Sequence, residues 1–142
     1  MKPLNRGVKS GRATHEPVTR AMLLQCYTAL DALLLGYGSC ELFATLGRYL
    51  LVAGELCRLG HQSDAIGHIA AARAAVVRMD ATEQQDRVWR IDDADYSRLC
   101  VAFAVLDDQL SVASLDDIAK AETSIAEGLL GAEREPVVVE PI

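Results

Sequence analysis

Apolar side chains recur at intervals of three and four residues along most of this chain, which is the spacing of one face of an α-helix. The first such stretch covers residues 14–36, where a threonine and a proline stand at the start and a glycine at the end. The second covers residues 39–60, and Ser39 is placed to cap its N-terminus. The third covers residues 63–79 and is rich in alanine. The pattern therefore predicts three successive helices.

A fourth apolar stripe with helical spacing runs over residues 88–110. The sequence Asp-Ala-Thr-Glu at residues 80–83 precedes it and has the spacing of a capping box, so we expect Asp80 or Thr82 to cap this segment. Two adjacent aspartates at positions 92 and 93 interrupt the stripe. The sequence leaves two alternatives open here, one bent helix or two short ones.

The two ends of the chain differ from the helical region between them. A fifth helix is expected from Ser114, which can cap it, to Gly131. Residues 1–13 are basic and lack a periodic apolar pattern, whereas residues 132–142 are rich in valine and fenced by prolines. We predict an all-α domain over residues 14–131, folded as an antiparallel four- or five-helix bundle, with a flexible basic N-terminal arm and an extended or disordered C-terminal tail.

Composition agrees with a helical globular domain. Hydrophobic residues make up 51% of the chain and charged residues 24%, while aromatic residues make up only 5%. Alanine and leucine dominate the apolar set and favour helices over strands. No stretch approaches the roughly 20 apolar residues that a membrane helix needs, and no apolar secretory core follows the basic N-terminus. A cytoplasmic location and no contact with a membrane are therefore expected.

The charge of the chain is unevenly distributed. The net charge is −6, and acidic residues outnumber basic ones between positions 80 and 122. This balance argues against binding to nucleic acid, because phosphate contacts need clustered lysine and arginine. It leaves open that the acidic face imitates nucleic acid and inhibits a protein with a basic groove. The acidic pairs themselves are expected to lie on a solvated surface.

Four cysteines are spread along the chain without a CxxC pair. Each lies among apolar neighbours in an expected helix, so we interpret them as reduced, buried thiols, and no zinc site is expected from their spacing. The four are Cys26, Cys40, Cys57 and Cys100.

The second and third expected helices form the most distinctive pattern in the sequence. Small and large apolar residues alternate along them around a glycine turn, and this pattern resembles one tetratricopeptide unit. Because no second copy follows at the 34-residue period of that family, we infer from the resemblance a packed antiparallel helical pair. Two glycines inside the second helix, Gly47 and Gly54, share one face, and we interpret them as a place where a neighbouring helix approaches closely, with flexibility of the helix as the alternative. The matching residues are Tyr49, Val52, Ala53, Leu56, Gly60, Ala65, Ile69 and Ala72.

His61, Asp64 and His68 are the candidate metal ligands, since imidazole and carboxylate groups at this spacing fall on one helical face. The outer pair is separated by about two turns, or roughly 10 Å, which is too far for one ion without a bend. A surface pair of His68 with Asp64 is the simpler interpretation. The sequence also lacks the motifs of common nucleophilic, phosphate-binding and zinc-dependent enzymes. We therefore expect no catalytic residue and no cofactor.

These features favour a non-enzymatic protein–protein interaction module, such as an adaptor, assembly or regulatory protein, that forms a homodimer through its first or second helix. The candidate interaction residues are Gly47 and Gly54, together with Val137, Val138 and Val139 in the tail, which could dock in a partner's groove. An acidic inhibitor and a small metal-binding or enzymatic bundle remain as alternatives.

Overall fold

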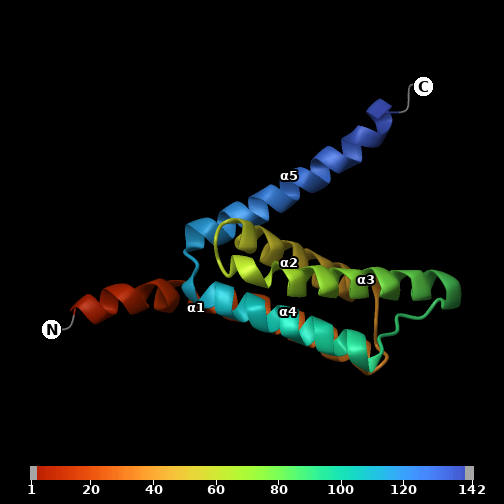
Figure 1. The fold of residues 1–142 in the computed structure, drawn as a ribbon, viewed down its shortest axis with the longest axis horizontal. Coiled ribbons are helices and arrows are strands. Elements are labelled where there is room, and N and C mark those ends of the chain that lie inside the picture. Colours follow the sequence, from red (N-terminus) through yellow and green to blue (C-terminus); the bar gives the residue numbers. More distant parts are fainter. Residues whose placement is uncertain (1–2, 140–142) are drawn as a thin grey trace.

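The protein is a bundle of α-helices (Figure 1). The computed structural model describes the backbone of residues 3–139 and the side chains of residues 16–128. No strand occurs in the described backbone, so the predicted all-α bundle is confirmed. The elements are α1 (Pro3–Leu34), α2 (Cys40–Arg58), a short 3-10 turn η1 (Ser63–Ala65), α3 (Ile66–Asp86), α4 (Asp93–Val112) and α5 (Leu115–Val139). None of these helices, over the described residues, is both long and apolar enough to cross a membrane.

Helix α2 lies at the centre of the fold, because it packs against α1, α3, α4 and α5. Helix α4 completes the bundle by packing against both α1 and α3. Helix α5 packs mainly on α2, and its C-terminal half runs away from the bundle (Figure 1). The side chains that fill the centre come from the predicted apolar stripes. The largest of them are Phe103, Leu30, Leu33, Leu46, Leu50, Leu56, Ile69, Met79, Leu99, Leu106 and Leu110.

Local signals set several of the helix ends. The hydroxyl oxygens of Ser39 and Ser114 accept hydrogen bonds from the backbone N–H groups three residues later, at 3.2 and 3.1 Å, so both predicted N-caps are confirmed. Gly36 and Gly60 follow the ends of α1 and α2 with φ values of 92° and 103°. Glycine adopts this left-handed conformation without strain, and the chain can turn there into the next helix.

The predicted start of the fourth helix is wrong. Asp80 and Thr82 lie inside α3, which continues to Asp86, and the capping box does not form. Asp92 caps α4 instead, with its carboxylate accepting the backbone N–H of Asp95 at 2.8 Å. A side chain can cap a helix only at its start, where the first backbone N–H groups lack partners within the helix. The backbone is not helical at residues 87–92, so such a start follows Asp92 and not Asp80. Neither open alternative is right, because residues 87–92 are not helical and a single helix, α4, covers the rest of the stripe.

The helices also extend further than predicted at both ends of the chain. The backbone is helical over residues 3–13 and 132–139, where we expected an irregular arm and an extended tail. Helix α1 continues through Pro17, although a proline inside a helix removes one backbone hydrogen bond and its ring crowds the carbonyl one turn earlier. The side chains of Val137, Val138 and Val139 lie outside the described residues. The division into a domain over residues 14–131 and two ends stays a prediction.

The tryptophan in the connection between α3 and α4 holds this connection against the start of α2. Trp89 stacks on Phe43 of α2, with 4.5 Å between the ring centroids. The same tryptophan closes over Gly38 in the connection between α1 and α2, where an added Cβ atom would lie 2.5 Å from the Cβ of Trp89. Gly38 therefore allows the two connections to meet.

Candidate functional site

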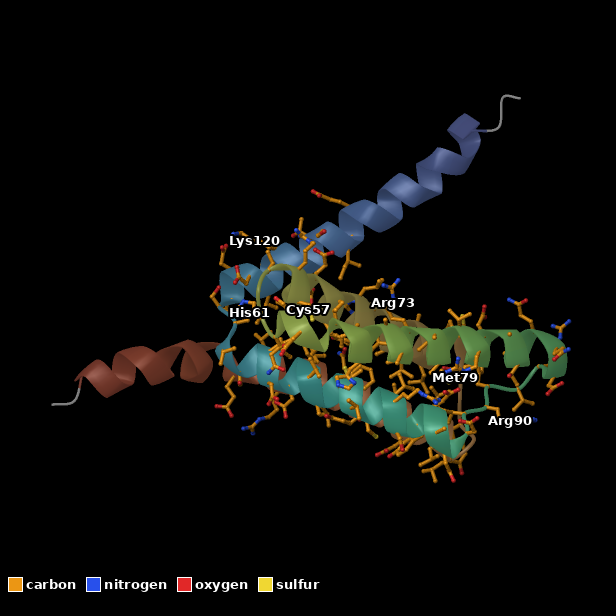
Figure 2. All side chains as sticks on the ribbon, in the orientation of Figure 1. Cys57, His61, Arg73, Met79, Arg90 and Lys120 are labelled. Atoms are coloured by element: carbon orange, nitrogen blue, oxygen red, sulfur yellow. The ribbon has the colours of Figure 1, made fainter. Side chains whose placement is uncertain are left out.

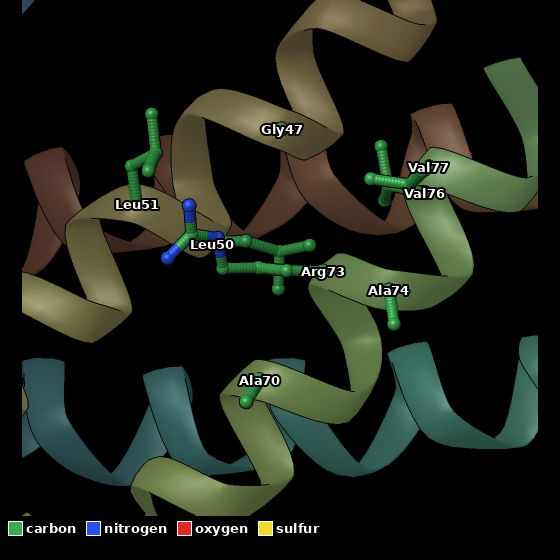
Figure 3. A pocket seen from close by; sticks show the side chains of 8 residues that line it. All are labelled: Gly47, Leu50, Leu51, Ala70, Arg73, Ala74, Val76 and Val77. Carbon is green, nitrogen blue, oxygen red and sulfur yellow. The ribbon is translucent and has the colours of Figure 1, made fainter.

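An open groove of about 440 Å³ lies between α2 and α3 (Figure 3). Leu50 and Val76 are buried and lie at its base, whereas the Val77 side chain is 67% exposed. Apolar side chains thus face solvent along the groove. The lining residues are Gly47, Leu50, Leu51, Ala70, Arg73, Ala74, Val76 and Val77.

The two glycines of α2 are not contact points between helices of this chain. A Cβ atom added to Gly47 would have no heavy atom within 4 Å, and one added to Gly54 would only reach the Cγ2 atom of Ile69 at 4.0 Å. Close approach of a neighbouring helix of this chain is therefore contradicted at Gly47, and at Gly54 an added Cβ atom would only reach ordinary contact distance from α3. Gly47 instead leaves open space in the wall of the groove. A role of either glycine in binding a partner stays a prediction.

Replacing Gly47 with alanine should stabilise the fold by about 0.5 to 1 kcal/mol, since alanine is the better helix former and the added methyl meets no atom. Urea unfolding followed by circular dichroism measures this gain. As a control, Gly60→Ala should reduce stability, because Gly60 has a φ of 103°. A loss of stability in Gly47→Ala would contradict the open space at this position.

Arg73 is the only charged residue among those that line the groove. Its side chain extends from α3 across the groove toward Leu50 and α2 (Figure 3). Among the side chains that the structure describes, no carboxylate forms an ion pair with it. The groove therefore combines an apolar surface with one unpaired positive charge.

Apart from the groove, a cluster of polar side chains lies where α2 turns toward α3 and where α5 begins (Figure 2). The Gln109 side chain is fully buried, and its amide nitrogen donates to the carbonyl oxygens of Ala53 and His61 at 3.1 and 3.0 Å. The imidazole Nε2 of His61 lies 2.9 Å from a carboxylate oxygen of Asp117 on α5. These contacts join three helices at one end of the bundle.

This cluster contains a thiol but lacks the features of a nucleophilic centre. The thiol of Cys57 lies 3.4 Å from the amide nitrogen of Gln109 and is buried, and this burial raises its pKa. Burial likewise raises the pKa of the Cys26 thiol, to about 12. A thiol acts as a nucleophile through its thiolate, so both stay unreactive at neutral pH. Cys40 is exposed and Cys100 partly buried, which corrects the expectation that all four are buried.

The candidate metal ligands are not brought together. His61 pairs with Asp117, and its predicted helical neighbours Asp64 and His68 are exposed. Over the residues with described side chains, no group of three histidine, cysteine or acidic side chains is arranged to hold a metal ion. The predicted bond between His68 and Asp64 is also absent among the described contacts. His61 lies in the turn between α2 and η1 and not on a helix, so the three candidate ligands do not share one helical face.

Several of the acidic residues have structural partners. Asp95 is buried at the start of α4, where Arg78 donates to both of its carboxylate oxygens at 3.1 and 2.7 Å and Arg98 donates at 2.6 Å. The Arg78 hydrogen bonds, with a further contribution from Arg98, lower the pKa of Asp95, although burial acts in the opposite direction. Asp92 caps α4 in the same region. The pair of Arg78 with Asp95 therefore links α3 to α4, while Asp92 fixes the start of α4.

Replacing Asp95 with asparagine should reduce the free energy of unfolding by about 1 to 2 kcal/mol at pH 7, a value discounted because both arginines are half exposed. The lowered pKa means that this contribution is fully present above the unfolded pKa of about 3.9 and is lost as the pH falls through the folded pKa. Urea unfolding between pH 2 and 7 should show the two proteins converging in acid. A pH-independent difference would contradict the ionised pair.

Comparison of the chain with protein-family models, curated proteins and solved structures found no match. The structure does confirm the helical pair that resembles a tetratricopeptide unit, since α2 and α3 pack against each other. A function is therefore inferred from the groove and its surroundings.

Proposed function

We propose that this protein is a non-enzymatic interaction module that binds a segment of another protein in the groove between α2 and α3. The main support is the apolar lining of this open groove, in which Val77 exposes two thirds of its side chain to water. Apolar surface gains free energy when it is removed from water, at about 25 cal/mol for each Å². Apolar grooves rimmed by polar residues are common sites of protein–protein contact.

The proposal includes self-association as a homodimer through α1 or α2. Leu24 of α1 is 65% exposed and supports this part, as does the position of the groove on α2. Sedimentation velocity over a range of protein concentrations tests it. A chain that stays monomeric at all concentrations would remove the homodimer and leave only a different protein as the partner.

The groove itself is tested with a matched pair of variants. Gly47→Leu fills the groove from α2, whereas Gly128→Leu places the same side chain on α5, and at both positions an added Cβ meets no atom within 4 Å. Tagged wild type and both variants are used to capture partners from extracts of the cells that express the protein, with quantitative mass spectrometry as the readout. Proteins lost with Gly47→Leu but kept with Gly128→Leu support the proposal. Equal recovery with all three proteins would overturn it.

The two alternative functions gain no support from the described side chains. An acidic mimic needs free carboxylates on one face, and three of the acids in question, Asp95, Asp92 and Asp117, are instead engaged in ion pairs, caps or hydrogen bonds. A metal-binding bundle needs converging ligands, which His61, Asp64 and His68 do not provide. Both remain hypotheses from the sequence.

A further inference from the structure

We infer that the groove between α2 and α3 takes an acidic amphipathic helix, and that a carboxylate of this helix pairs with Arg73. This inference rests on the proposed function and names the chemical class of the partner.

The arrangement of the lining residues favours a helical partner. Ala70, Arg73, Ala74 and Val77 fall at positions i, i+3, i+4 and i+7 of α3, and Gly47 and Leu51 provide the facing positions of α2. Two neighbouring helices leave a furrow between them, and a third helix fills it with side chains at the same spacing. The lined length of α3 is about 10 Å, or two helical turns. A segment of about three turns is therefore sufficient to cover the groove.

The charge of the partner follows from the position of Arg73. Its side chain lies across the apolar groove, so a helix that covers the groove also removes the guanidinium from water (Figure 3). Burying a charge without a partner is strongly unfavourable, whereas a carboxylate matches the planar donors of arginine and forms strong hydrogen bonds with them. A purely apolar helix lacks this compensation. The best occupant therefore has leucine-like anchors and an acidic side chain between them.

Two described carboxylates, one on α2 and one on α5, are engaged in ion pairs of their own. Glu55 accepts a hydrogen bond from Arg58 at 2.7 Å, and Glu122 lies 3.4 Å from Arg48. Neither pairs with Arg73, and no other described carboxylate does, so a carboxylate of the occupant can pair with it. A second copy of this chain, whose net charge is −6, is one possible source and is distinguished below from a different protein.

The probe is a library of random 14-residue peptides displayed on phage and selected against three immobilised proteins: wild type, Arg73→Glu and Lys120→Glu. Lys120 lies on α5, outside the groove lining, and its substitution changes the net charge by the same amount as Arg73→Glu. Selected peptides are then measured by fluorescence polarisation against wild type, Arg73→Glu, Lys120→Glu and Gly47→Leu. Circular dichroism of each variant confirms that it remains helical.

We expect peptides selected by wild type and by Lys120→Glu to carry apolar residues at i, i+4 and i+7 with a glutamate or aspartate between them. Their affinity should fall about tenfold or more with Arg73→Glu, because hydrogen bonds between charged groups contribute at this level. Arg73→Glu should select lysine or arginine at the same peptide position. Added peptide should also dissociate a homodimer if a second copy occupies the groove, and a dimer unchanged by peptide assigns the groove to a different protein.

Two results separate failure of this inference from failure of the proposed function. Peptides that lose affinity with Gly47→Leu but show no preference for acids would overturn the inference and keep the groove as a binding site. The absence of any peptide sensitive to Gly47→Leu would overturn both. Equal effects of Arg73→Glu and Lys120→Glu on acidic peptides would also overturn the inference, because they would reduce the effect to net charge.

Discussion

Replacing Gln109 with glutamate is expected to destabilise the folded protein by at least about 3 kcal/mol at neutral pH, a large part of the 5–15 kcal/mol typical of a domain. The wild-type amide nitrogen donates to the carbonyl oxygens of Ala53 and His61 in a site sealed from water. Glutamate has almost the same shape but turns a carboxylate oxygen toward these two oxygens. The charge is then buried without a donor, and chemical unfolding monitored by Trp89 fluorescence measures the loss.

The effect of Gln109→Glu should depend on pH. Burial raises the pKa of an introduced glutamate above its unfolded value of about 4.3, so stability is highest below that pH and is lost as the pH rises through the folded pKa. Gln109→Leu is the control, because it removes both donors without adding charge and should lower stability by about 1 to 3 kcal/mol at every pH. If Gln109→Glu matched the wild type at pH 7, the polar cluster would have to be open to water.

Replacing Gly38 with alanine is expected to destabilise the protein by about 2 to 3 kcal/mol. The added Cβ atom would lie 2.5 Å from the Cδ2 atom of Leu33 and from the Cβ atom of Trp89, and the latter atom cannot rotate away. The φ of Gly38 lies outside the left-handed region, so the effect is a steric one. Urea unfolding measures the loss, and a shift in the emission of Trp89, the only tryptophan of the chain, reports its displacement from Phe43.

A matched control for Gly38→Ala is Gly128→Ala. A Cβ atom at Gly128 meets no heavy atom within 4 Å, and alanine favours the helix, so this variant should keep or slightly gain stability. Its tryptophan emission should stay unchanged. An unchanged unfolding midpoint and emission for Gly38→Ala would mean that the two connections do not meet at this glycine.

The helices and their caps were predictable because their signals are local. The caps at Ser39 and Ser114 each depend on a hydroxyl and a backbone N–H three residues away, and both are readable from sequence. The end of α3 was not predictable in this way. The capping-box sequence at residues 80–83 lies inside α3, where the backbone N–H groups already have partners and need no cap. The prolines at positions 17 and 136 were expected to mark helix boundaries, but the backbone is helical on both sides of each.

The candidate site was predictable only in part. Gly47 was identified from its cost in a helix, but the sequence could not show that it faces open space and not another helix. Arg73 was missed, although Ala70, Ala74 and Val77 make α3 apolar on a second face beyond its buried one. A helix with two apolar faces is a signal of a second contact surface. Gln109 was missed because its partners are backbone carbonyls from distant residues, and sequence patterns do not record them.

The peripheral position of α5 has a consequence for how the protein can come apart. Its main contacts are with α2, and its polar links to the bundle are the pairs of His61 with Asp117 and of Arg48 with Glu122. Most of the large core side chains lie on the other four helices, whereas α5 contributes Ile118 and Ala121. We therefore expect α5 to be the first helix to detach, which would also allow its exchange between two copies of the chain.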